Sequence, residues 1–372
     1  MIRVFEPKID LQDIFEVSKT LYSSNISGTS QTVNKFEKQL ADKFEREYAV
    51  ALSNGSVALD VALNLIDLNE GDEVILPSFT IISCLSAVVR SGAKPVFCDV
   101  DQLTWNMNLD NVKEVYTEKT KAVLMVHTFG LTAEAKKISD FCSENNLILI
   151  EDAAEAHGQI ESSLKCGSFG DISTMSFYAN KHITTGEGGA VLTNSKEKYD
   201  LAKQIINLDF KSAQRFQHDN LYWNYRMGGL QAALGISQIK KVEKTIKKKI
   251  EQGLFYNKLL KEHEDIVSMQ PVEINSIKNN FWVFGVLLQR DNIRDSVIKH
   301  LYENNIETRP FFWPLHLQPA LPKEYLATNK NLSISENLGS NGLYIPIGAH
   351  LSRKNQIEIV KKLIEAIELF SK

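Results

Sequence analysis

The chain has few cysteines and no excess of positive charge, and each absence excludes a class of function. Four of its 372 residues are cysteine, with no CxxC pair and no metal-ligand spacing: Cys84, Cys98, Cys142 and Cys166. We therefore expect reduced, packed thiols in a cytoplasmic protein without a bound metal. The net charge of −4 argues against binding to nucleic acid, which favours a basic excess. Any anionic ligand would have to be held by local groups.

Long apolar runs are also missing. The N-terminus, Met1–Pro7, lacks the apolar region of a signal peptide, and no run is long enough to cross a membrane. No internal repeat, low-complexity tract or extended linker interrupts the chain. With 43% hydrophobic and 24% charged residues, the composition is that of a globular protein not associated with a membrane. The length suggests two or three domains.

Short apolar segments alternate with helix-like segments along most of the chain. This alternation predicts an α/β protein with a mixed, mostly parallel sheet. The predicted strands are 47–50, 73–76, 95–99, 122–126, 147–150, 175–177 and 190–193, and the helices between them include 57–68 and 133–145. We predict a large domain over residues 1–240, with an N-terminal segment over 1–25, and a smaller C-terminal α/β domain over 241–372.

A lysine-rich helix is expected to connect the two predicted domains. Residues 240–250 resemble a basic ligand patch, but Val242, Ile246 and Ile250 recur at helical spacing. We interpret the lysines as the solvated face of a helix whose apolar stripe is buried. The small domain then supplies a strand at 282–288 and helices near 293–304 and 352–369.

Lys181 stands in a run of apolar and small residues, directly before a glycine-rich turn at 186–189. A lysine in poorly solvated surroundings has a lowered pKa and attacks carbonyl groups as a free amine. Taken alone, a lysine beside a turn is more often exposed. Its significance depends on what lies upstream.

Upstream, the apolar strand 147–150 ends in Glu151 and Asp152. Ligands of open α/β sheets bind at the carboxyl ends of the strands. Asp152 either caps the next helix or faces the ring nitrogen of pyridoxal 5′-phosphate (PLP), which needs a carboxylate there to keep the ring electron-withdrawing. The following Ser176 and Lys181, five residues apart before a glycine turn, favour the PLP site.

Several motifs, in order along almost the whole chain, resemble the DegT/DnrJ family of PLP-dependent sugar-nucleotide aminotransferases. They are 53–59 (SNGSVAL), 71–78 (GDEVILPS), 92–96 (GAKPV) with Asp99, 151–156 (EDAAEA), the Lys181 segment, 224–227 (NYRM) and 306–310 (IETRP) extending to His316. Within the family, the Lys181 segment together with 224–227 is most similar to GDP-perosamine synthases, which aminate C4 of a 4-keto-6-deoxyhexose.

The resemblance implies PLP fold type I, the aspartate-aminotransferase fold, and a homodimer with shared active sites. It also implies L-glutamate as amino donor, a nucleotide-linked keto sugar as acceptor, and a ping-pong cycle between PLP and pyridoxamine phosphate. Lys181 would bind the cofactor covalently and act as acid and base. The other cofactor contacts would be Gly55, Ser56 and Ser176 at the phosphate, Asp152 at the ring nitrogen, Glu155 near the ring oxygen, and Asn224 at the phosphate of the neighbouring subunit.

The segment 309–316 is the candidate for binding the substrate, as the resemblance implies for His316. Arg309 carries a forked set of donors that suits the carboxylate of the amino donor or a phosphate, and it also suits a structural role. The aromatic residues between them fit a substrate loop or a buried hinge equally well. His182, next to Lys181, is interpreted as a packed histidine, because neighbouring side chains in an extended segment point to opposite faces.

Two positions depart from the family pattern. Ile81 stands where relatives place an aromatic ring on the cofactor, and Asp209 stands near a position where GDP-perosamine synthases commonly have glycine. The substrate therefore stays open: amination at C3, a dTDP- or UDP-linked sugar, or a non-catalytic regulator with the same fold are the alternatives.

Overall fold

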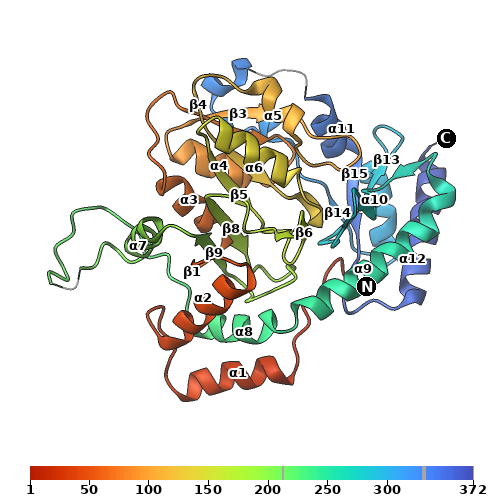
Figure 1. Cartoon of the computed structure of the whole chain (residues 1–372). Coiled ribbons are helices and arrows are strands. Elements are labelled where there is room, and N and C mark those ends of the chain that lie inside the picture. The colour runs from red at the N-terminus through yellow and green to blue at the C-terminus, as the bar shows by residue number, and fades with distance from the viewer. Residues whose placement is uncertain (212, 329–331, 372) are drawn as a thin grey trace.

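The computed structural model describes residues 1–211, 213–328 and 332–371 (Figure 1). A seven-stranded sheet forms the centre of the large domain, in the order β1-β9-β8-β5-β4-β2-β3. Strand β9 runs antiparallel to both neighbours, and the remaining pairs are parallel. The strands are β1 Tyr48–Leu52, β2 Glu73–Pro77, β3 Lys94–Cys98, β4 Thr120–Val126, β5 Ile148–Asp152, β8 Ile172–Ser176 and β9 Gly189–Thr193.

Helices cover both faces of this sheet, which explains why its strands are mostly buried: all residues of β2 and β9 are buried. One face packs on α2 Gln31–Lys43, α6 Ala135–Glu144 and α8 Gly229–Ile239. The other packs on α3 Gly55–Asn64, α4 Ile82–Arg90 and α7 Lys196–Ile205. The four cysteines are free and buried, as expected. The predicted α/β class with a mostly parallel sheet is confirmed.

A second sheet forms the small domain, with four antiparallel strands in the order β10-β13-β15-β14. These strands are β10 Val267–Ser268, β13 Phe284–Leu288, β14 Arg309–Pro310 and β15 Gly342–Ile345. They pack on α10 Arg294–Glu303 and α12 Arg353–Phe370. The other elements are α1 Leu11–Tyr22, α5 Leu109–Val115, α11 Ser333–Asn341 and two hairpins, β6 Ile160–Glu161 with β7 Leu164–Lys165 and β11 Glu273–Ile274 with β12 Ile277–Lys278.

Helix α9, Val242–Leu260, runs from the large domain to the small one (Figure 1). Val242 and Ile246 are buried and Ile250 is half-buried, so the predicted apolar stripe is confirmed. Lys249 is also buried, which the solvated-face interpretation does not anticipate.

The N-terminal segment does not belong wholly to the large domain. Ile2 exchanges backbone hydrogen bonds with Asn305 and Glu307, and Val4 accepts one from Ile347. The first residues therefore pair with the small domain before α1 returns to α8 (Figure 1). The assignment of residues 1–25 to the large domain stays a prediction, and the pairing shows that its first residues contact the edge of the small domain. Within the described residues, no helix has the length and apolarity needed to cross a membrane.

Candidate active site

The carboxyl ends of β5 and β8 lie side by side and place the predicted site residues at one edge of the sheet. Asp152 ends β5 and pairs in register with Thr174 of β8. Ser176 ends β8, and Lys181 follows in the loop behind it. This is the edge at which open α/β sheets bind ligands.

Lys181 is held inside the protein rather than exposed. Its side chain is 9% exposed, and Nζ lies 3.5 Å from Glu155 Oε1. Nζ also lies 3.6 Å from the centroid of the Trp282 ring. Burial lowers the pKa of Lys181, while the charges of Glu155 and Asp152 act against that shift. The result is a lysine whose neutral, nucleophilic form is more accessible than that of an exposed lysine.

Asp152 has one well-bonded oxygen and one nearly free oxygen. Oδ1 accepts hydrogen bonds from Ala154 N at 3.1 Å and Thr174 Oγ1 at 3.2 Å. Oδ2 has only the Cys84 thiol, at 3.5 Å. Burial raises the pKa of Asp152 because these contacts do not replace the lost hydration. A cationic N–H in front of Oδ2 would supply the missing partner. The bond from Ala154 N holds the turn that follows β5, and no helix begins there, so Asp152 does not cap a helix.

Glu155 is buried between Lys181 and the loop that follows β4. Oε2 accepts a hydrogen bond from Phe129 N at 2.9 Å. Burial raises the pKa of Glu155 to about 7, with the charge of Lys181 opposing the shift. A carboxyl group titrating near neutrality beside a buried amine can exchange a proton with it during a reaction.

The start of α3 forms a cradle with the end of β8. Asn54 caps the helix, accepting a hydrogen bond from Val57 N at 2.9 Å. A Cβ on Gly55 would lie 2.7 Å from Ser176 Cβ, so only glycine fits there without displacing Ser176. Ser56 Oγ lies 2.7 Å from Ser83 Oγ on α4. Helix N-terminal N–H groups with serine hydroxyls around them suit a phosphate.

Ile81 immediately precedes α4 and is 39% exposed. Its carbonyl oxygen accepts a hydrogen bond from Cys84 N at 3.1 Å, and the thiol of Cys84 contacts Asp152. The start of α4 therefore lies beside both Asp152 and the α3 cradle. Its contact with a cofactor ring stays a prediction.

Asn224 is exposed and pairs with Asn207 in an isolated bridge. The next residue, Tyr225, accepts a hydrogen bond from Ser53 N at 2.9 Å, so this segment lies near the start of α3 in the same chain. The predicted contact with a neighbouring subunit stays a prediction. Asp209, the second departure from the family pattern, is buried and accepts bonds from Asp219 N and Asn220 N, which fixes its own loop.

Arg309 and His316 lie in different environments. Arg309 on β14 is exposed and forms an ion pair with Glu307 at 2.5 Å. His316 is 3% exposed, with Nδ1 2.6 Å from Ser78 Oγ and Nε2 3.3 Å from Glu336 Oε1. Both ring nitrogens of His316 are thus engaged within the chain. His316 ties its loop to the end of β2, and the substrate roles of both residues stay predictions.

Two residues of the site were not predicted from the sequence. Trp282 covers Lys181, and Lys249 donates a hydrogen bond from Nζ to Trp282 O at 2.7 Å. Nothing in the sequence separates Trp282 from a core residue of the strand predicted at 282–288. His182 is buried, with Nε2 3.2 Å from Asn280 O, which agrees with the interpretation as a packed histidine.

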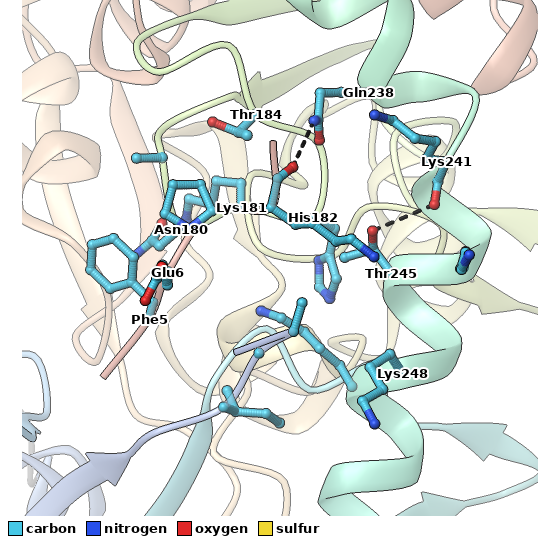
Figure 2. A pocket seen from close by; sticks show the side chains of 18 of the residues that line it. Phe5, Glu6, Asn180, Lys181, His182, Thr184, Gln238, Lys241, Thr245 and Lys248 are labelled. Atoms are coloured by element: carbon cyan, nitrogen blue, oxygen red, sulfur yellow. Dashed lines mark hydrogen bonds between the residues drawn. The ribbon is translucent and has the colours of Figure 1, made fainter. Parts of the chain in front are cut away.

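A pocket of about 490 Å³ borders the Lys181 segment (Figure 2). Lysines from the α8–α9 stretch line one side, and Phe5 and Asn180 line another. Glu155, Asp152 and Trp282 do not line it, so the pocket lies beside the polar contacts of the Lys181 amine and not around them. Its wall carries seven lysines against three acids: Lys8, Lys181, Lys241, Lys244, Lys247, Lys248 and Lys249 against Glu6, Asp10 and Glu251.

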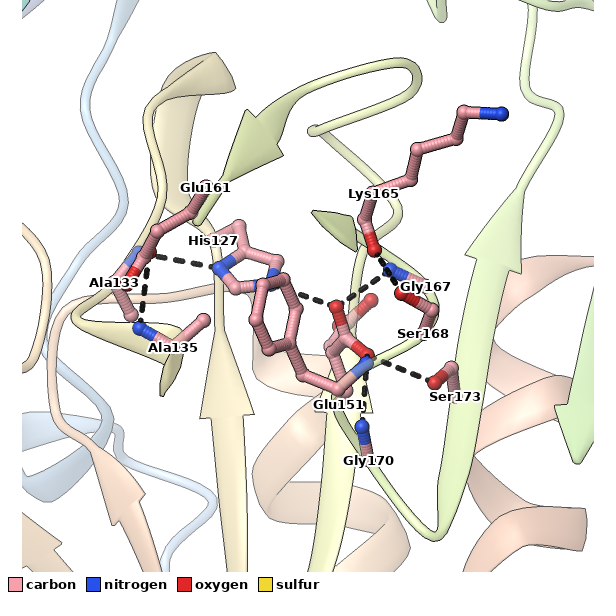
Figure 3. Close-up of polar contacts among 12 residues, drawn as sticks. His127, Ala133, Ala135, Glu151, Glu161, Lys165, Gly167, Ser168, Gly170 and Ser173 are labelled. Atoms are coloured by element: carbon pink, nitrogen blue, oxygen red, sulfur yellow. Dashed lines mark hydrogen bonds and ion pairs between the residues drawn. The ribbon is translucent and has the colours of Figure 1, made fainter. Parts of the chain in front are cut away.

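A buried polar cluster behind the strand ends resembles a metal site in composition. His127, Glu151 and Cys166 place one ligand atom each within 4.8 Å of one another. Figure 3, however, shows the oxygens of Glu151 already engaged, accepting hydrogen bonds from His127, Ser173, Gly167 N and Gly170 N. Phe169 N donates a further bond to Glu151. We interpret the cluster as a brace for the loop between β7 and β8. The expectation of no bound metal stays a prediction.

The residues at this edge fit PLP on three counts. The cradle at Gly55 and Ser176 suits a phosphate, Asp152 Oδ2 has no hydrogen-bond donor among the described residues besides the Cys84 thiol, and Lys181 supplies a buried amine with a lowered pKa. When bound there, PLP supplies an electron sink for bond cleavage at an amine-bearing carbon. The fold and the site together define a PLP-dependent aminotransferase of fold type I.

Comparison with known proteins supports the same class. Residues 7–364 match the DegT/DnrJ/EryC1/StrS aminotransferase family, and the chain belongs to this family. It is 35% identical to the GDP-perosamine synthase of Escherichia coli O157:H7 over 98% of each chain. It is 34% identical to that of Vibrio cholerae, covering 93% of this chain and 94% of the other. The structure of an aminotransferase from Psychrobacter cryohalolentis superposes with a TM-score of 0.88 at 28% identity, over 99% of this chain and 98% of that one.

Proposed function

We propose that the protein transfers the amino group of L-glutamate to C4 of a nucleotide-linked 4-keto-6-deoxyhexose, in the manner of a GDP-perosamine synthase. The observation that carries the proposal is the buried Lys181 amine between Glu155 and Trp282, within a chain about one-third identical to GDP-perosamine synthases over nearly its whole length. PLP would alternate with pyridoxamine phosphate in a ping-pong cycle.

Each site residue has a defined task in this proposal. Gly55, Ser56 and Ser176 hold the phosphate, and Asp152 keeps a proton on the ring nitrogen. Lys181 attaches the cofactor and moves a proton at the reacting carbon, because its lowered pKa lets it act as base and then as acid. Glu155, with a pKa of about 7, buffers the charge on Lys181.

A nucleotide-linked substrate is supported by the charge of the pocket beside Lys181. Lys8, Lys244, Lys247 and Lys248 line that pocket, and within the described part of the chain none of them forms an ion pair. The whole protein carries a net charge of −4, so this cationic region is local. A concentration of like charge in a concave surface raises the local concentration of oppositely charged ligands, here the diphosphate.

A homodimer with shared sites is supported by apolar side chains left exposed on one chain. On α1, Leu11 is 82%, Phe15 61% and Tyr22 94% exposed. In the segment that precedes Asn224 and projects from the body in Figure 1, Phe216 is 78% and Leu221 97% exposed. Exposed apolar groups at this density are typical of a surface covered by a partner. Four free, buried thiols suit a reducing compartment, and we place the reaction in the cytoplasm.

The test is direct amination. Purified protein with PLP and L-glutamate is incubated with GDP-, dTDP- and UDP-linked 4-keto-6-deoxy sugars, and products are identified by mass spectrometry and NMR. We expect the GDP-linked sugar to be aminated at C4 with the highest kcat/KM. Preference for another base or for C3 would replace the substrate but keep the class. No amination of any sugar by protein that binds PLP would favour a regulator.

A further inference from the structure

The indole of Trp282 is the closest aromatic surface to the Lys181 amine. Nζ lies 3.6 Å from the ring centroid, well inside the range of about 6 Å over which a ring face attracts a cation. Trp282 is 5% exposed and Lys181 is buried, so little water competes for the ammonium group. Within the described residues, the nearest carboxylate oxygen to Nζ is Glu155 Oε1, at 3.5 Å.

Three hydrogen bonds from three separate parts of the chain fix Trp282. Its backbone N donates to Phe129 O at 3.1 Å, and its carbonyl accepts from Lys249 Nζ at 2.7 Å. Its indole Nε1 donates to Asn180 O at 3.2 Å, in the same segment as Lys181. Every polar atom of Trp282 therefore has a partner.

The backbone on both sides of this contact adopts an unusual conformation. Phe129 has φ 64 and Phe281 has φ 48, in the left-handed region that bulky residues rarely adopt. A Cβ on Gly130 would lie 2.5 Å from Trp282 N, so this close approach requires glycine. Such strain concentrates at sites where the chain must hold a group in one place.

Phe129 bonds to both neighbours of the lysine, Glu155 and Trp282. Its N–H donates to Glu155 Oε2 at 2.9 Å, and its carbonyl accepts from Trp282 N at 3.1 Å. Phe129 therefore holds both the Glu155 carboxylate and the Trp282 residue whose indole lies next to the amine.

We propose that Trp282 is a positioning residue for Lys181: its indole face receives the free ammonium and holds it near Glu155 whenever the amine is not bonded to the cofactor. The inference rests on the proposed role of Lys181. In a two-step amino transfer the lysine is released and reused in each cycle, so a defined resting position shortens its return. The indole also favours the protonated amine, which partly offsets the effect of burial.

The first measurement is the pKa of Lys181 in the full-length chain freed of cofactor. Acetylation with acetic anhydride over a pH series, with the Lys181 peptide quantified by mass spectrometry, gives the midpoint. Lys258, exposed on α9 and outside the pocket, is the internal reference in each protein. We expect Trp282→Leu to lower the Lys181 pKa by roughly 0.4–1.5 pH units, and Trp282→Phe, which keeps a ring face, to lower it by less than half as much. An unchanged midpoint in Trp282→Leu, or equal shifts in both variants, overturns the proposal.

A second measurement covers the case in which Trp282→Leu does not fold. The tryptophan fluorescence of the parent is expected to change with pH at the Lys181 midpoint, and the change should be absent in Lys181→Met and in Trp282→Phe. Persistence of the change in Lys181→Met would contradict the contact. Neither readout uses a sugar, so inactivity in the amination assay would sink the proposed function and leave this inference standing.

Discussion

Lys181, Glu155 and Asp152 share one desolvated space in which an amine faces two carboxyl groups. Burial lowers the pKa of Lys181 and raises the pKa of Asp152 and of Glu155, the latter to about 7. Burial therefore disfavours the charged form of each group, while the opposite charges nearby favour it. With its pKa raised to about 7, Glu155 can exchange a proton with the Lys181 amine beside it. This balance suits a lysine that must act as nucleophile, base and acid in turn.

Replacing Asp152 by asparagine tests its role at the ring nitrogen. An amide cannot keep that nitrogen protonated, so we expect Asp152→Asn to fold and bind PLP weakly but to lose about 10²–10³-fold in kcat, the size of losing one electrostatic contact with developing charge. Steady-state kinetics with a circular-dichroism check of folding measures this. If kcat is unchanged, Asp152 serves only the bonds that it accepts from Ala154 N and Thr174 Oγ1.

At Ile81, a larger aromatic side chain is predicted to be tolerated. The side chain is 39% exposed, so Ile81→Tyr has room, and the usual overpacking cost of about 1–3 kcal/mol should not apply. Stacking on the cofactor ring would then tighten PLP binding by about 0.5–1.5 kcal/mol, up to roughly tenfold in Kd. Equilibrium titration with PLP compares the two proteins. Weaker binding by the tyrosine variant would mean that another residue covers the ring.

At the level of single residues, the sequence indicated those whose chemistry is local. Asp152 follows an apolar strand and Lys181 precedes a glycine turn, so both could be found in the chain. Trp282 and Lys249 could not, because their importance comes from contacts with residues about 100 and 33 positions away. His316 was indicated by the resemblance to the family. Its burial against Ser78 and Glu336 was not, because no local pattern predicts that packing.

Helix α9 combines a structural role with an electrostatic one. Its apolar stripe at Val242 and Ile246 was predictable from helical spacing. Lys249 falls next to that stripe and is carried into the interior, where Nζ bonds to Trp282 O. Burial, assisted by the charge of Lys181, lowers the pKa of Lys249 to about 7.

The lowered pKa of Lys249 makes a prediction about stability. Below pH 7 the folded protein holds a buried ammonium at a cost, and this cost is relieved as the pH rises from the folded pKa of about 7 toward the unfolded value of 10.5. The free energy of unfolding of the parent, minus that of Lys249→Met, should therefore increase between pH 7 and 10, by at most about 1.4 kcal/mol per pH unit for each chain. Urea unfolding at several pH values measures the difference, with Lys258→Met as the control. A difference independent of pH would mean that Lys249 keeps an ordinary pKa.

Among the elements, the long buried strands of the large domain were predictable and the short strands of the small domain were not. Strands β2, β4 and β5 are continuous apolar runs, and the predicted bounds fall within two residues of the observed ones. The two-residue strands β10 and β14 carry no periodic signal. The predicted strand at 282–288 begins in fact at Phe284, because residues 280–282 leave the sheet to pack against the loop after β4.

At the scale of the whole molecule, the N-terminal residues and α9 both join the two domains (Figure 1). The pocket of Figure 2 lies where these two connections meet the Lys181 segment. Trp282 precedes β13 of the small domain and bonds to Phe129 and Asn180 of the large one, so it lies where the two domains meet. No local sequence pattern indicates this junction.

Shared active sites in a dimer are tested by complementation. If Asn224 serves the site of its neighbour, a mixed dimer of Lys181→Ala and Asn224→Asp chains contains one intact site and one doubly damaged site. Random exchange of the two inactive proteins should then restore about a quarter of the parent activity. Sedimentation velocity establishes the dimer in each case. Fully active monomers, or no recovery in verified mixed dimers, would place Asn224 outside the partner's site.

The central claim is that Lys181 is the amine that binds the cofactor. Purified protein is incubated with PLP, reduced with sodium borohydride and digested, and the peptide carrying the phosphopyridoxyl group is identified by mass spectrometry, with Lys181→Ala and Lys249→Met treated in parallel. We expect near-stoichiometric labelling of Lys181 in the parent and in Lys249→Met, and loss of specific labelling in Lys181→Ala. Labelling of a different lysine in the parent, or undiminished specific labelling of Lys181→Ala, would contradict it.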